Sequence, residues 1–104
     1  MAKAIIDAGI CGEQTTVEAN LIEDYTVSLE IDSSCKFIQN LAKNLTDVEA
    51  FNEISFQRGM PETLQKGAKY CTHAACPVPT GIIKAIEVAA GLALPKNATI
   101  ELEK

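Results

Sequence analysis

Four cysteines are the residues of this 104-residue chain whose type and placement best suit chemistry. Reduced thiols commonly serve buried packing, redox chemistry or metal binding. Packing cysteines usually lie inside helices or strands, whereas each of these stands where one expected element ends and another begins. Tetrahedral thiolate sites suit zinc, with Zn–S bonds of about 2.3 Å, or an iron–sulfur cluster. We therefore predict one metal site formed by Cys11, Cys35, Cys71 and Cys76.

The spacing of the cysteines leaves other roles open. Cys71 and Cys76 are separated by four residues, which matches neither the paired motif of a zinc ribbon nor a ferredoxin run. Inert reduced thiols and a redox pair made by these two cysteines are the alternatives. His73, the only histidine, lies between them. We interpret His73 as a loop residue, with a ligand role as the alternative, because four thiolates already complete a tetrahedron.

Period-two patterns predict the strands that would carry these cysteines. Residues 3–9 form a short apolar run that ends at Gly9, which is typical of a strand. Two alternating runs, 16–22 and 25–32, are joined by the polar pair Glu23-Asp24 and predict an antiparallel hairpin with one buried face. Alternation of Ala98, Ile100 and Leu102 with polar residues predicts a final strand.

After the hairpin, the apolar residues recur at the spacing of helices. Ser33 and Ser34 are good caps for a helix that begins at Cys35 and continues to 45. We expect a short helix over 46–54, a helix that opens at 60–62, and an apolar helix over 80–94 that ends at Leu94-Pro95. Residues 1–104 are therefore predicted to form a single α+β domain, with an antiparallel sheet of three to four strands and helices on one face. The expected order is strand, hairpin, helices, strand.

The order of the cysteines resembles that of the TSCPD domain, a short module found alone and at the C-terminus of some ribonucleotide reductases. That module has an early Cys, a Cys that begins the first helix after a strand, and a late pair whose second member is followed by Pro and a final helix. The resemblance covers residues 5–92 and implies metal binding through the cysteines. Ala74-Ala75-Cys76-Pro77-Val78 stands where the module has Thr-Ser-Cys-Pro-Asp, which indicates a separate family with a related fold.

The chain is also similar to the U-type iron–sulfur assembly scaffold. Cys11-Gly12-Glu13 stands where that family has Cys-Gly-Asp, and Cys35 and Cys76 follow in the same order. This similarity implies binding or delivery of an iron–sulfur cluster, with Glu13 in the place of the scaffold's Asp. From its residue type alone, Glu13 is a solvated turn residue.

Composition narrows the remaining functions. The net charge is −5 and no Lys/Arg cluster is present, so we expect no nucleic-acid binding. The longest apolar segment carries Lys84 and Glu87 and predicts no membrane span, and we expect a cytoplasmic protein. No catalytic motif occurs, so the leading hypothesis is a structural zinc domain without activity of its own. An iron–sulfur binding or delivery protein and a thiol redox protein are the alternatives. We expect the chain to be a monomer or a homodimer, and an unidentified protein partner is compatible with each of these functions.

Overall fold

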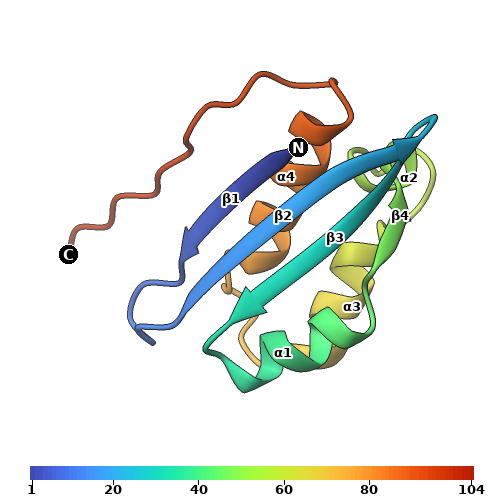
Figure 1. Ribbon diagram of the computed structural model, residues 1–104. Coiled ribbons are helices and arrows are strands. Elements are labelled where there is room, and N and C mark those ends of the chain that lie inside the picture. Colours follow the sequence, from blue (N-terminus) through green and yellow to red (C-terminus); the bar gives the residue numbers. More distant parts are fainter.

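A four-stranded antiparallel sheet in the order β1-β2-β3-β4 forms one layer of the computed structural model, which describes residues 1–104 (Figure 1). Its strands are β1 (Ala2–Asp7), β2 (Gln14–Glu23), β3 (Thr26–Ser33) and β4 (Asp47–Glu49). The helices cover one face of the sheet and are α1 (Lys36–Lys43), α2 (Ala50–Glu53), α3 (Glu62–Tyr70) and α4 (Val78–Ala89). The predicted α+β class and antiparallel sheet are confirmed.

The predicted hairpin is formed by β2 and β3. Val17 lies opposite Ile31, and Ala19 lies opposite Leu29. The period-two pattern buries one face of this hairpin against the helices, because alternate side chains of a strand point to opposite faces. Asp24, in the turn, adopts a positive φ of 46°, a conformation that Asp tolerates better than most residues.

The fourth strand departs from the prediction. The short helix expected over 46–54 begins only at Ala50, and the three residues before it form β4. Val48 pairs with Val27 of β3 and is buried. A three-residue strand is too short to show a period in the sequence, so only its pairing with β3 reveals it.

Helix α4 lies close against β1 and β2. Ile82 and Ile86 are fully buried in the aliphatic core that this helix shares with the sheet. The close approach depends on Gly81, because a Cβ at this position would overlap the Ile6 side chain of β1. This contact places the beginning of α4 near the end of β1, and Figure 1 shows the other end of the helix near the start of the strand, so the two elements run in opposite directions.

The C-terminal prediction is wrong in two respects. Helix α4 ends at Ala89, well before the expected Leu94. Gly91, with a φ of +75°, donates to the Val88 carbonyl and Leu92 donates to the Glu87 carbonyl, which is the Schellman pattern that closes helices. The strand expected over 98–102 is not formed, and residues 91–104 are exposed. Alternation selects a face, but it does not supply the neighbouring strand that pairing needs.

A buried carboxylate closes the start of α3. Glu53 is 2% exposed. Its oxygens accept hydrogen bonds from the Thr63 hydroxyl (2.6 Å), the Thr63 amide (2.8 Å) and the Glu62 amide (3.1 Å). Pro61 occupies the N-cap position and has no side-chain acceptor, so Glu53 supplies the acceptor that the helix start requires. None of the helices combines the length and the apolar content that crossing a membrane requires.

Candidate thiol site

All four cysteines line one cavity of about 650 Å³ at the end of the sheet where β1 and β3 terminate. Cys11 lies in the turn after β1, and Cys35 is the N-cap residue of α1. Cys71 directly follows α3, and Cys76 precedes α4 by one residue. The predicted placement of every cysteine at a junction between elements is therefore confirmed, and the fold brings the four junctions to a common cavity.

The wall of this cavity is largely apolar. Ile10, Phe37, Ile38 and Val78 contribute to it beside the thiols. Charged forms of side chains are disfavoured in such surroundings, because apolar groups replace part of the water that would solvate them. Soft sulfur donors in an apolar wall suit thiophilic metals better than they suit the oxygen-seeking ions calcium and magnesium.

The Cys71 thiol lies within electrostatic reach of two other thiols. Burial, the largest cause, and the neighbouring thiols of Cys76 and Cys35 together raise the pKa of Cys71 from 9.0 to about 11. Cys35, Cys71 and Cys76 therefore form a cluster, which we call the thiol cluster. Cys11 is exposed and lines the same cavity without adding to the shift.

The thiol cluster does not have the geometry of a formed metal site. All four cysteines are free thiols, and no group of three or more His, Cys, Asp or Glu side chains is arranged to hold a metal ion. His73 lines the cavity but is exposed, and Glu13 lines it half-buried. Ligation therefore requires the junction loops to close further around the cluster.

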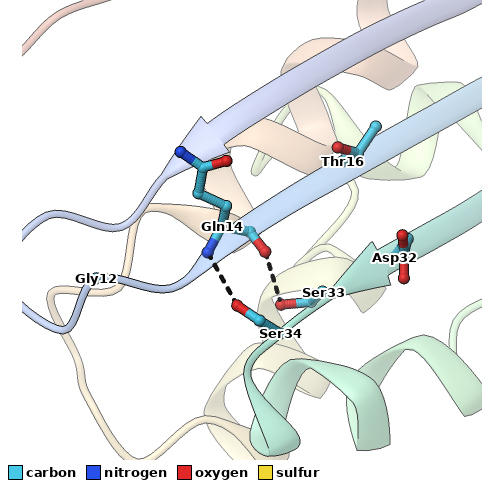
Figure 2. A pocket seen from close by; sticks show the side chains of 6 residues that line it. All are labelled: Gly12, Gln14, Thr16, Asp32, Ser33 and Ser34. Carbon is cyan, nitrogen blue, oxygen red and sulfur yellow. Dashed lines mark hydrogen bonds between the residues drawn. The ribbon is translucent and has the colours of Figure 1, made fainter.

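The backbone of Cys35 is held by the Ser33 hydroxyl at the end of β3. Figure 2 shows a polar depression where the Gln14 amide donates to Ser34 Oγ (3.2 Å) and Ser33 Oγ donates to the Gln14 carbonyl (3.3 Å). Ser33 Oγ also accepts from the Cys35 amide (3.1 Å). The two serines were expected to cap α1, but Cys35 occupies the N-cap position and no side chain caps the helix. They instead fasten β2 to β3 and fix the backbone beside the thiol cluster.

Cys11 is carried by a glycine-containing turn. Gly9 and Gly12 have φ values of 89° and 75°, which residues with a Cβ rarely adopt. The Gly12 amide donates to the Gly9 carbonyl at 2.9 Å and closes the turn. The Cys11 thiol therefore sits at the tip of a short turn that few packing contacts restrain.

Comparison with protein-family models places this geometry in a family context. Residues 2–102 match the model of a family of unknown function, DUF6951. The chain belongs to that family. No curated protein and no solved structure matched the chain. Membership in DUF6951 therefore assigns no chemistry to the cysteines, and their role has to be inferred from the cavity and the thiol cluster.

Two apolar residues of the site were not expected to belong to it. The helical spacing placed Phe37 in the buried stripe of α1, but its side chain is 47% exposed and lines the cavity. Ile10 lies beside Cys11 in the exposed turn and contributes to the same wall. The signal available in the sequence was the position of both residues within two residues of a cysteine.

Proposed function

We propose that this member of DUF6951 is a metal-binding domain in which thiolates of Cys11, Cys35, Cys71 and Cys76 hold a zinc ion with a structural role. The observation that carries this proposal is that all four cysteines, from four separate junctions of the fold, line one largely apolar cavity. Four protein ligands would leave no open position for a substrate, which is the arrangement of structural zinc sites.

Electrostatics explains why such a cluster needs a cation. Thiolates that lie close together in apolar surroundings repel each other, and the raised pKa of Cys71 is one expression of that cost. A divalent ion removes the repulsion and lets the thiols lose their protons at neutral pH. The Cys11 turn is exposed and can move toward the cluster to provide the fourth ligand.

Metal content is the direct test of this proposal. The protein is purified anaerobically without chelators and analysed for zinc, iron and acid-labile sulfide. About one zinc per chain is expected, because one tetrahedral site takes one ion. If the analysis finds iron and acid-labile sulfide instead of zinc, the same thiols hold an iron–sulfur cluster and the zinc proposal is wrong. Absence of both metals, with four titratable thiols per chain, would contradict the proposal.

Single substitutions then identify the ligands. Cys71→Ser should weaken zinc binding by more than the ~10–100-fold that loss of an outer hydrogen-bond partner costs. Thr72→Ser, in the same loop, is the matched control and should leave affinity unchanged. His73→Ala should also leave affinity unchanged, and a large loss in that variant would move the ligand role from a thiol to the imidazole.

A second candidate function is thiol redox chemistry. It is favoured by the position of Cys71 and Cys76 in the wall of one cavity, with both thiols free. In this reaction the two thiols lose two protons and two electrons to form a disulfide, while a disulfide of a partner molecule is reduced to two thiols. Incubation with oxidised glutathione followed by peptide mapping tests it: a Cys71–Cys76 disulfide in protein that holds no metal supports this function over zinc binding.

A further inference from the structure

The C-terminal segment leaves the body of the molecule as an extended stretch of chain that belongs to no helix or strand (Figure 1). Residues 91–104 are exposed, and no turn or loop backbone hydrogen bond involves a residue beyond Leu92. Ala98, Ile100 and Leu102 alternate with polar residues, and the exposed fractions of Ile100 and Leu102 are 80% and 89%. A segment with this alternation has its apolar side chains on one face, and in the single chain that face is exposed to water.

Strand β1 offers the complementary feature. It pairs with β2 along one side and forms the edge of the sheet along the other. An edge strand presents unpaired backbone N–H and C=O groups, which are a template for a further strand. The side chains of Ala2, Ala4 and Ile6 face the helices, and Lys3, Ile5 and Asp7 face outward.

We propose that residues Asn97–Leu102 of one copy pair antiparallel with β1 of a second copy, and that the exchange is reciprocal in a two-fold dimer. The register that fits both faces sets Leu102 opposite Ala2, Ile100 opposite Ala4 and Ala98 opposite Ile6. The apolar side chains of the segment then join the helix-covered face of the sheet. On the outer face, Glu101 lies opposite Lys3, and opposite charges across a strand pair are stabilising.

The orientation of the added strand follows the rest of the sheet. Every strand pair of this sheet is antiparallel, and antiparallel pairs are slightly more stable per residue than parallel ones. A parallel strand in the register that sets Leu102 beside Ile6 would also place Glu103 beside Asp7, and like charges directly opposite each other destabilise a pair. The antiparallel register contains no such like-charge pair.

The length of the chain shows why the partner is a second copy. Helix α4 ends beside the start of β1, and Figure 1 shows the tail leaving that point in the same direction as β1. To pair antiparallel with its own β1, Asn97 would have to reach Asp7 at the far end of the strand. The five residue steps from Leu92 to Asn97 span at most ~18 Å, which is about the length of β1. No residues would then remain to reverse the direction of the chain. A second copy approaches in the required direction without this restriction.

Charge reversal in the full-length chain tests the proposal without disturbing the core. Sedimentation velocity with reductant and chelator should show a concentration-dependent dimer of the native chain. Lys3→Glu and Glu101→Lys should each weaken that dimer by roughly 10-fold, because two pairs per dimer become repulsive. An equimolar mixture of the two variants should recover the native affinity, because each edge then meets a segment of opposite charge.

The results of these experiments distinguish reciprocal strand exchange from a monomer and from other dimers. A native chain that stays monomeric up to high concentration, variants that dimerise like the native chain, or a mixture that fails to recover would each overturn the proposal. Leu102→Asp should weaken the dimer by on the order of 100-fold, because it places a charge on the covered face. Leu94→Asp, in the same tail but outside the paired segment, is the matched control, and an equal loss in this variant would also contradict the register.

Discussion

The Glu53 carboxylate and the thiol cluster lie at opposite ends of the sheet and differ in how the chain stabilises their charged forms. At the end near β4, the Glu53 carboxylate accepts three hydrogen bonds from Glu62 and Thr63 and is satisfied within the chain. At the other end, burial and the neighbouring thiols of Cys76 and Cys35 raise the pKa of Cys71 and so disfavour its charged form. The carboxylate at the first end is therefore satisfied by the chain itself, whereas the function proposed above has a cation from outside the chain stabilise the charged form of the thiols at the second end.

Zinc should produce the largest effect, and only at the cysteine end. Adding one equivalent to reduced, metal-free protein should raise the Tm by about 20 °C or more, since structural zinc contributes several kcal/mol at roughly 4–8 °C per kcal/mol. Differential scanning fluorimetry measures the change. Cys76→Ser should abolish most of it. An unchanged Tm in the native chain would contradict the claim that the thiol cluster, unlike the Glu53 carboxylate, needs a metal ion.

Removing the Glu53 carboxylate should produce the next largest effect, and it should not depend on metal. Glu53→Ala leaves the Thr63 hydroxyl and two helix-start amides without their acceptor, which should lower the free energy of unfolding by about 3 kcal/mol. Urea denaturation with and without zinc measures it. Glu53→Gln, which keeps one acceptor oxygen, is the milder control. A loss confined to the zinc-bound form would show that the two ends are coupled.

Gly81 connects the packing of α4 to the cysteine end. Gly81→Ala sets a Cβ against Ile6 and should cost about 1–3 kcal/mol, although Ala is normally the better helix residue. Because Gly81 lies in the first half of α4, just after Cys76, the displaced helix should also weaken zinc binding. In an Ile6→Ala background, which lacks both close atoms Cγ1 and Cδ1, Gly81→Ala should no longer destabilise the chain. A stabilising Gly81→Ala variant would contradict the close approach of α4 to β1.

The smallest expected effect is a pH dependence of the metal-free protein. Burial and the neighbouring thiols of Cys76 and Cys35 hold the pKa of Cys71 at about 11 in the folded chain, against 9.0 for a free thiol. The folded state therefore keeps this proton to higher pH, so the related stability is present below pH 9 and is lost as the pH rises toward 11. Solvent screening of the half-buried thiol keeps the change under about 1 kcal/mol.

The urea midpoints at pH 8 and pH 10.5 measure this loss, with Cys71→Ser as the control. The serine variant should lose less stability over that interval, because its hydroxyl does not titrate. Equal losses in the two proteins would show that Cys71 is not the group responsible.

The alternation of apolar and polar residues predicted those strands that are long enough to display it. The hairpin of β2 and β3 was found because alternation over two runs fixes the buried face, as Val17 and Leu29 show. Strand β4 was missed because three residues cannot display a period. The unformed strand over 98–102 has the right alternation, but strand formation depends on a neighbour that the sequence does not specify.

The site was predicted only in part. Placement of cysteines at junctions indicated that they converge, and the fold brings all four to one cavity. The geometry among the sulfurs could not be predicted, because it depends on loops that the packing of α3 and α4 positions. The role of Glu53 was also missed. Its signal was Pro61 at the start of α3, a residue without the side-chain acceptor that a helix start needs.

Residue-resolved alkylation of the reduced protein, with and without zinc, tests the central claim most directly. Without metal, the exposed Cys11 should react fastest and Cys71 slowest near pH 8, because alkylation requires the thiolate. With one equivalent of zinc, Cys11, Cys35, Cys71 and Cys76 should all be protected together, as mass spectrometry of the digested protein would show. Unchanged reactivity of the four thiols after zinc addition would contradict the claim that a metal completes the cluster.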